Sequence, residues 1–430
     1  MTLARVHLWG SPIGVVQWQE ESALASFEYT PDFQRSGVQP APLEMPLGPG
    51  VWRFPALART SFQGLPGLLS DSLPDRFGNA LIDAWLASQG RTPASFHPVE
   101  RLCYVGSRGM GALEFEPAFE RGPAGPANLD VERLRALASQ ALTDRSAFVT
   151  SLTGDASQGA ADILRVGTSA GGARAKAVIA WNETTGEVRS GQVPAPDGFT
   201  HWILKFDGVS GNRDKELADP EGYGQVEYAY SLMALAAGID MMPCRLLSEA
   251  GRHHFMTRRF DRGPAGEKLH MQTLGALAHL DYNLPRSHSY EQAFAALRRL
   301  QIAAEGREQL YRRALFNVLA RNQDDHVKNI AFLMDRAGTW YLAPAYDLTF
   351  AYNPGGAWTG EHQMSLRGKR DGFEREDLLG LGKDQDLARG AVRSIFEQVQ
   401  EAVARWPEFA AQAQLDENHA RRIGALHRVL

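Results

Sequence analysis

The sequence is short of cysteine. Its 430 residues include only Cys103 and Cys244, which are far apart and lack the spacing of a metal site. This argues against a disulfide-stabilised secreted domain and favours a reduced cytoplasmic compartment. No apolar run approaches the ~18 residues that span a bilayer, and residues 1–5 lack the apolar core of a signal peptide. We therefore expect a cytoplasmic protein without membrane contact.

A surplus of basic residues is also missing. The formal net charge is -5, whereas a protein that coats nucleic acid would be basic. Any contact with DNA is therefore expected to be local or to run through a partner. Repeats and low-complexity segments are absent too, and a composition of 44% hydrophobic and 22% charged residues is typical of a globular protein with a sizeable core. The length suggests about two or three domains.

A polar loop between two apolar segments is the most informative stretch. Residues 321–329 read Arg-Asn-Gln-Asp-Asp-His-Val-Lys-Asn, after a helical pattern and before an apolar run. Asp324 and Asn329 have the spacing of the protein-kinase catalytic loop, in which the Asp accepts the proton of the attacking hydroxyl and the Asn binds magnesium. The alternative is a solvated turn that caps the flanking elements.

The segment after this loop strengthens the kinase interpretation. Residues 330–334 and 339–342 are short apolar runs that predict a β-hairpin, and the second run leads to Asp347. A kinase has its second magnesium-binding aspartate just past such a hairpin. Mg²⁺ prefers carboxylate and amide oxygens together with substrate phosphates, so Asp324, Asn329 and Asp347 form a coherent set for phosphoryl transfer.

A loop of small residues precedes this region. Strands are expected at 163–166 and 177–181, and residues 167–176 between them include several glycines and alanines. Small residues let backbone amides approach an anion closely, as in a lid over nucleotide phosphates. The stretch is neither a P-loop nor a full kinase glycine loop, and a plain hairpin loop is the alternative.

Lys205 lies in an apolar strand, where a lysine is costly unless it has a partner. Kinases place such a lysine on the phosphates of ATP; on an edge strand it would face water instead. Glu227, in a helix expected at 225–237, could pair with Lys205 or simply favour the helix dipole. The strand that ends at 258–262 has the position of a kinase hinge. There Asp261 could hold ribose hydroxyls or pair with Arg262.

The first 120 residues have the pattern of a β-rich unit. Its expected elements are a hairpin of residues 6–9 and 15–18, a strand at 25–29, a helix at 79–88 introduced by Leu73-Pro74-Asp75, and strands at 103–105 and 112–115. Residues 106–111 could pass for a phosphate cradle, but no helix follows them, so a hairpin turn is predicted. A linker is expected at 116–128, a helix at 130–142, and mostly helices from 265 onward.

These motifs occur in one order, which is Leu73-Pro-Asp, the Ser169 loop, Lys205, Arg259-Phe-Asp-Arg262, Asn322 to Asn329 and Ala345-Tyr-Asp347. Over nearly the whole chain this resembles the HipA family of bacterial serine/threonine kinases, the toxins of type II toxin–antitoxin systems. The resemblance implies an α+β, two-lobed protein-kinase-like fold. Its parts would be an amino-terminal β-rich subdomain at 1–120, a small lobe at 121–262, and an all-helical carboxy-terminal lobe at 263–430.

The resemblance also implies ATP and Mg²⁺ as cofactors and a role for each matching residue. Asp324 would be the catalytic aspartate, with His326 and Lys328 beside it, and Asn329 and Asp347 would bind magnesium. The nucleotide would be held by Lys205, Lys176, Ser169, Ala170, Gly171, Gly172, the backbone of Arg258 and Phe260, and Asp261. Autophosphorylation of Ser169 would shut the kinase down, although Thr168 is a second acceptor. Asp325 departs from the family because a glycine is common there, and it adds a negative charge beside the base.

Family members phosphorylate an aminoacyl-tRNA synthetase, which halts translation and gives growth arrest or drug tolerance. They are neutralised by a small, HipB-like helix-turn-helix antitoxin, through which the pair represses its own operon. The resemblance therefore implies a toxin kinase that reaches DNA only through its antitoxin. Two alternatives stay open, a catalytically weak co-repressor with a kinase-like fold and a kinase for a small molecule or lipid head group.

Overall fold

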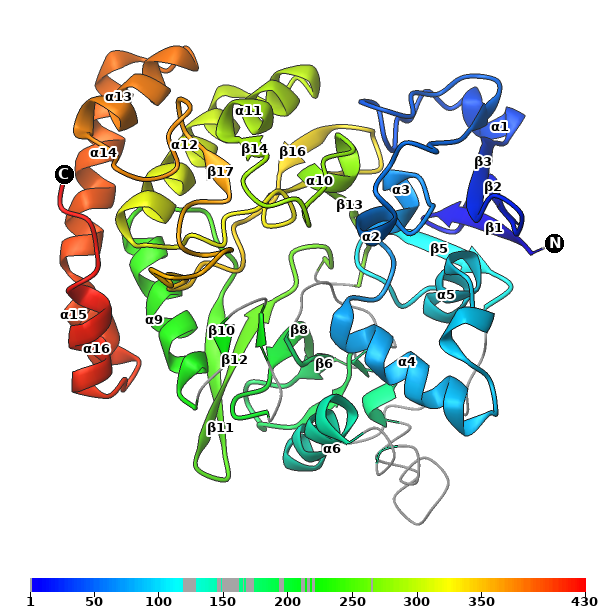
Figure 1. Cartoon of the computed structure of the whole chain (residues 1–430), viewed down its shortest axis with the longest axis horizontal. Helices are drawn as coiled ribbons and strands as arrows, with labels where there is room; N and C mark the ends of the chain where they lie inside the picture. Colours follow the sequence, from blue (N-terminus) through cyan, green and yellow to red (C-terminus); the bar gives the residue numbers. More distant parts are fainter. Residues whose placement is uncertain are drawn as a thin grey trace.

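The computed structural model describes residues 2–118, 129–144, 148, 162–164, 166–167, 174–192, 197–209, 213–214, 217–218, 221–263 and 266–430. The predicted loop residues Thr168, Ser169, Ala170, Gly171 and Gly172 lie outside these ranges. Figure 1 shows the amino-terminal strands, in blue, and the carboxy-terminal helices, in red, at opposite ends of the molecule. A second sheet, in green, lies below and between them. No described helix combines the length and apolar character needed to cross a bilayer.

The amino-terminal subdomain is built on an antiparallel sheet of five strands in the order β4-β3-β2-β1-β5. The strands are β1 (Leu3–Leu8), β2 (Ser11–Gln19), β3 (Leu24–Tyr29), β4 (Val51–Trp52) and β5 (Leu113–Glu116). Alternate residues of β1 are buried, because successive side chains of a strand point to opposite faces. The predicted hairpin and third strand are therefore confirmed.

Several helices lie between β3 and β5 in the sequence. They are α1 (Pro31–Gln34), α2 (Arg59–Phe62), α3 (Gly67–Ser70), α4 (Arg76–Ser88), η1 (Pro93–Ser95) and α5 (Pro98–Val105). Two of them, α1 and α5, pack against this sheet. The strand predicted at 103–105 is wrong, because these residues end α5. A capping box of His97 and Glu100, with Pro98 at the first helical position, starts that helix. The turn at 106–111 therefore joins a helix to β5 and not two strands.

The second sheet has the order β11-β12-β8-β6-β7 and is antiparallel throughout. Its strands are β6 (Lys176–Trp181), β7 (Val188–Ser190), β8 (Thr200–Lys205), β11 (Cys244–Glu249) and β12 (Arg252–Arg258), and β9 (Arg213–Asp214) pairs with β10 (Leu217–Ala218) nearby. Helix α6 (Val131–Thr143), which confirms the helix predicted at 130–142, shares one apolar cluster with α4, β6 and β8. Helix α9 (Tyr223–Ala236) packs against β11 and β12.

The strand predicted at 163–166 is also wrong. Residues 162–164 are helical, and the amide of Gly167 donates to the carbonyl of Ile163 over 2.8 Å, which is a helical i to i-4 bond. Ile163, Leu164 and Val166 are buried in the same cluster as α6. A short apolar run cannot be assigned to strand or helix from its periodicity alone, and packing here favours the helix.

The carboxy-terminal lobe is helical apart from two small sheets. Its helices are α10 (Leu274–Leu277), α11 (Tyr290–Arg299), α12 (Ala304–Leu319), α13 (Arg375–Asp384), α14 (Arg389–Ala404), α15 (Trp406–Gln412) and α16 (Glu417–Gly424). The predicted hairpin is confirmed as β15 (Ala331–Met334) and β16 (Trp340–Leu342), and β13 (His270–Thr273) pairs with β15. Strands β14 (His288–Ser289) and β17 (Met364–Ser365) pair in parallel.

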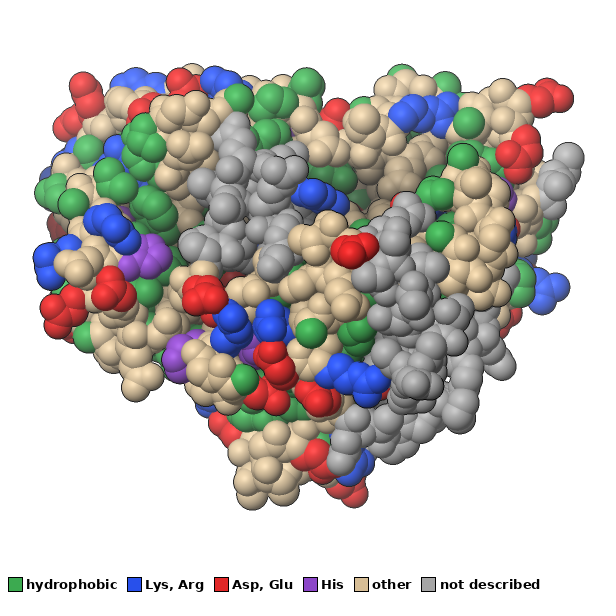
Figure 2. Space-filling view, turned by 60° about the horizontal axis from the view of Figure 1, so that its bottom comes forward, with side chains coloured by type: hydrophobic (Ala, Val, Ile, Leu, Met, Phe, Trp, Pro, Cys, Tyr) green, Lys and Arg blue, Asp and Glu red, His purple; other side chains and the backbone are tan. Residues whose placement is uncertain are grey.

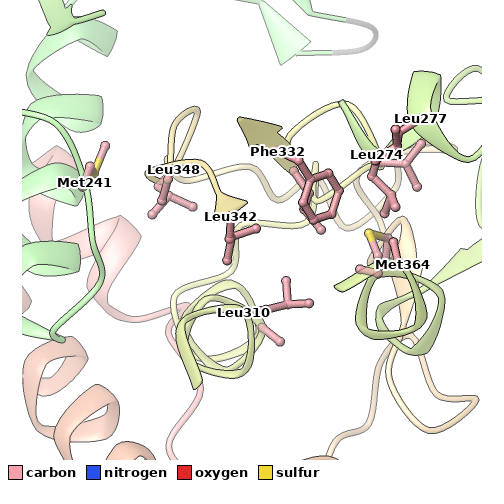
Figure 3. Close-up of a cluster of buried hydrophobic side chains, with 14 of the residues drawn as sticks. Met241, Leu274, Leu277, Leu310, Phe332, Leu342, Leu348 and Met364 are labelled. Carbon is pink, nitrogen blue, oxygen red and sulfur yellow. The ribbon is translucent and has the colours of Figure 1, made fainter. Parts of the chain in front are cut away.

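The core of this lobe continues into the amino-terminal subdomain. Figure 3 shows Leu310 of α12 among Leu342, Phe332 and Met364, with Leu274 of α10 close by. The same cluster of buried side chains includes residues of β1, β2 and β3 and of α3, which packs on α10. The amino-terminal subdomain therefore shares its core with the large lobe, and its position relative to that lobe is set by packing.

Candidate active site

Lys205 at the end of β8 stands between two carboxylates. Its Nζ donates to Oε1 of Glu227, 2.5 Å away on α9, and to Oδ1 of Asp347. The Glu227 side chain is 2% exposed, so the pair is buried. The ion pair between Lys205 and Glu227, one of the two roles considered for that glutamate, is therefore present. Asp347 has a φ of 52°, and non-glycine residues in this left-handed conformation cluster at functional sites.

The charges of these groups depend on one another. Burial alone would lower the pKa of Lys205, but Asp347 and Glu227 outweigh it and raise that pKa. Burial alone would raise the pKa of Asp347, but Lys205 and Lys176 outweigh it and lower that pKa to about 2. Burial raises the pKa of Glu227, against the opposing effect of Lys205. Lys205 and Asp347 are therefore a charged pair at neutral pH.

The predicted catalytic loop, residues 321–329, follows α12 and contains a hydrogen bond between its own residues. The Nδ2 of Asn329 donates to the backbone carbonyl of Asp324 over 2.9 Å, which joins the two ends of the predicted motif. Nε2 of His326 lies 3.9 Å from Oδ1 of Asp324. The ammonium of Lys328 lies 4.6 Å from the ring centre of Tyr282. The hydroxyl of Tyr346, next to Asp347, donates to the carbonyl of Lys328. This bond ties the loop to the segment that carries Asp347.

The residues present fit a magnesium ion held together with a nucleotide. Among the described residues, no three His, Cys, Asp or Glu side chains gather as a metal site. Magnesium typically takes one or two protein ligands and completes its shell with phosphate oxygens and water. The carboxylate of Asp347, ionised at neutral pH because of its low pKa, and the amide oxygen of Asn329 are ligands of that kind.

Asp325 has a role that the sequence did not reveal. Its side chain is buried and accepts hydrogen bonds from the hydroxyl of Tyr290, Nδ1 of His362 and the amide of Gln363, at 2.7, 2.9 and 2.8 Å. Nε2 of His362 in turn lies 3.0 Å from Nη1 of Arg428. The negative charge expected beside the base therefore points into the interior, where it fixes the catalytic loop. In the sequence Asp325 stands among predicted active-site residues, so nothing indicated that its side chain points into the interior.

The cavity below the catalytic loop is too small for a nucleotide. It has a volume of about 20 Å³ and is lined by Arg313, Asn317, Asn322, Asp325 and Asn329 among others, room for about one water molecule. Nε of Arg313 and Oδ1 of Asn322 are buried without a hydrogen-bond partner in the protein.

The residues predicted to form a hinge, 258–262, lie at the end of β12. The amide of Arg258 donates to the carbonyl of Pro243, and the ring of Phe260 packs 5.6 Å from that of Tyr346. Asp261 is fully buried, paired with Arg259 and Arg262, and accepts from the amide of Gly111. The pairing with Arg262, the alternative considered for this residue, is therefore present. A ribose contact would require these bonds to rearrange.

Together the two lobes, the lysine between two acids and the catalytic loop define a protein-kinase-like α+β fold. The chain matches the model of the HipA-like C-terminal domain over residues 168–406 and that of the HipA N-terminal domain over residues 4–116. It therefore belongs to the HipA family.

Two relatives illustrate the match. A protein of Sinorhizobium fredii, Y4mE, provisionally named a kinase, is 30% identical over 210 residues, which are 43% of this chain and 47% of that relative. The chain thus spans about half the length of this curated relative. HipA in the complex of HipA, HipB and operator DNA from Shewanella oneidensis MR-1 has 18% sequence identity and a TM-score of 0.68. That match covers 99% of this chain and 94% of the other, so the fold is shared end to end.

Proposed function

We propose that this chain is an ATP-dependent serine/threonine protein kinase that acts as the toxin of a toxin–antitoxin pair. The observation that carries the proposal is Lys205, whose ammonium contacts both Glu227 and Asp347. A protein kinase is competent only when its lysine–glutamate pair and its metal-binding aspartate are in place together. A protein that had lost this activity would have no need to keep these three charges together, with Glu227 buried among them.

Each residue then has a task in binding. Lys205 and Lys176 would neutralise the phosphates of ATP, and Asn329 with Asp347 would hold magnesium. When bound, the metal neutralises charge on the phosphate oxygens. Phosphoryl transfer depends mainly on such positioning and charge neutralisation and needs no nucleophile from the protein.

The transfer step assigns the proton to Asp324. The acceptor oxygen forms a bond to the γ-phosphorus while the bond from that phosphorus to the bridging oxygen of ADP breaks. ADP leaves with the electron pair, and Asp324 takes the proton of the hydroxyl. The indole of Trp358 donates to Oδ1 of Asp324, which fixes the carboxylate for that task.

The proposed acceptors follow from membership of the HipA family. We propose an aminoacyl-tRNA synthetase as the protein substrate and Ser169, with Thr168 as a second site, for autophosphorylation. A phosphoryl group there would add about -1.5 to -2 charges where the phosphates of ATP bind, so the phosphorylated chain should lose affinity for ATP.

A small helix-turn-helix antitoxin is the proposed partner. On the face in Figure 2, acidic and basic side chains are interspersed over the described surface, which suits indirect contact with DNA through that partner.

The test compares ATP turnover by the purified wild-type chain and by Asp324→Asn. With wild type, intact-mass measurement should show added phosphate on the chain itself and on a member of a panel of aminoacyl-tRNA synthetases. Asp324→Asn should slow transfer by about 10² to 10⁴ while still binding ATP. Transfer by Asp324→Asn at the wild-type rate would refute the assignment of the base. No turnover by wild type, with repression of its operon by chain and antitoxin together, would favour the co-repressor instead.

A further inference from the structure

The Leu73-Pro-Asp motif lies between α3 and α4, and the proposed function assigns it no role. Oδ1 of Asp75 accepts from the amide of Gly78 over 2.7 Å and caps α4. Oδ2 of the same carboxylate lies 3.2 Å from Nζ of Lys176. The two side chains are 5% and 4% exposed, so this is a buried ion pair. It joins the amino-terminal subdomain to the first residue of β6.

Lys176 is the cross-strand neighbour of Lys205, since their Cα atoms are partners in the pairing of β6 with β8. Directly opposed residues of an antiparallel pair have their side chains on one face, so Lys176 and Lys205 extend from the same face of the sheet. Lys205 is neutralised by Glu227 and Asp347. Lys176 has Asp75, and Lys176 also contributes to the low pKa of Asp347.

A second acid of the same segment faces the other active-site lysine. Asp71 accepts from the amide and hydroxyl of Thr273 over 2.6 and 3.0 Å, and it lines a small cavity with Lys328 and Tyr282. Burial raises the pKa of Asp71, and Lys328 opposes that rise more than any other group. Residues 71–75 therefore bring two acids close to two lysines of the candidate active site, Asp71 to Lys328 and Asp75 to Lys176.

We propose that Asp75 is a positioning residue of the ATP site: it holds Lys176 beside Lys205 so that both ammonium groups face the phosphates. The amino-terminal subdomain is then a working part of the kinase. The inference rests on the proposed function, because it takes the ligand to be a nucleoside triphosphate. Without Asp75, the buried Lys176 would lose the carboxylate with which it forms an ion pair and would move away from a second cation, since removing one partner of a buried pair is strongly unfavourable.

Asp75→Asn separates the charge from the helix cap. Asparagine caps helices as well as aspartate does, so α4 keeps its cap while Lys176 loses its ion pair with Asp75. The dissociation constant of MgATP, measured by calorimetry, should rise about tenfold, because Lys176 then loses a charged hydrogen bond to the phosphates. Asp130→Asn is the matched control. Asp130 caps α6 at an exposed position through the amide of Arg133, and its variant should bind MgATP as wild type does.

A double-mutant cycle shows whether Asp75 acts through Lys176. Lys176→Met should weaken MgATP binding, and adding Asp75→Asn to it should weaken binding no further. An equal loss in both backgrounds, or full affinity in Asp75→Asn or in Lys176→Met, overturns the proposal. If Asp75→Asn does not fold, the double variant, which leaves neither charge unpaired, is compared with Lys176→Met alone. Wild type that binds MgATP but transfers no phosphate contradicts only the proposed function; wild type that binds none contradicts both.

Discussion

The indole Nε1 of Trp358 donates a hydrogen bond of 2.5 Å to Oδ1 of Asp324, joining residues 34 positions apart in the sequence. Trp358 belongs to the segment that follows Asp347 and is 7% exposed. The carbonyl of Trp358 accepts a hydrogen bond from the side-chain Nε2 of Gln363, and the backbone amide of Gln363 donates to Asp325. One segment therefore holds both adjacent aspartates. Trp358 donates to the side chain of Asp324, and Gln363 donates to the buried side chain of Asp325.

Trp358→Phe should keep the packing and remove the donor to Asp324. Without that bond the carboxylate is held less firmly toward the hydroxyl that it must deprotonate, and a small misplacement of a catalytic group is costly. We expect kcat to fall about tenfold, with the KM for ATP near that of wild type, because the hydrogen bond that is removed goes to Asp324 and not to a residue that we assign to the phosphates. Steady-state kinetics on a synthetase or on autophosphorylation measures this, and an unchanged kcat would show that Asp324 is held by other contacts.

Glu227→Gln should weaken the hold on Lys205 without changing the size of the side chain. Asp347 would then be the only carboxylate at Lys205, and the lysine would follow it toward the metal site. We expect kcat/KM for ATP to fall about tenfold, or 1.4 kcal/mol. Glu221→Gln is the control, because Glu221 forms an exposed ion pair with Arg252. If both variants behave alike, the pair with Lys205 has no special role.

Asp325→Ala should destabilise the fold. It would leave the hydroxyl of Tyr290, the ring of His362 and an amide without their buried acceptor, so we expect a loss of about 3–5 kcal/mol in the free energy of unfolding. Urea denaturation measures it. Asp384→Ala, which removes an ion pair with Arg367 that is exposed on both sides, should cost less than about 1 kcal/mol. Equal losses would mean that Asp325 does not anchor the loop.

The low pKa of Asp347 predicts a pH dependence of stability. The pKa is about 2 in the folded chain, below the ordinary 3.8, so the unfolded chain binds more protons between these values. Stability from this group is complete above the unfolded pKa and is lost as the pH falls through the folded pKa. The difference in unfolding free energy between wild type and Asp347→Asn should be about 1–2 kcal/mol at neutral pH and shrink below about pH 4. A difference that stays constant with pH would contradict the assignment.

Much of the fold was predictable because its signals are local. The hairpin after the catalytic loop, the strand with Lys205 and the helix with Glu227 each follow from apolar periodicity over a few residues. Short apolar runs were harder. Residues 103–105 and 162–164 are helical because of a capping box and of packing in a shared core, respectively, and a run of three or four residues shows neither.

The sequence alone determined which groups are available and which of them are neighbours along the chain, above all Asp324 and Asn329. Only the tertiary structure decided which distant side chains pair: Asp75 with Lys176, Lys205 with Asp347, and Asp325 with His362. The physical reason is that a buried charge must find its counter-charge wherever packing brings one within about 4 Å. The partner of Lys176 is a hundred residues away, at a distance where no local pattern points to it.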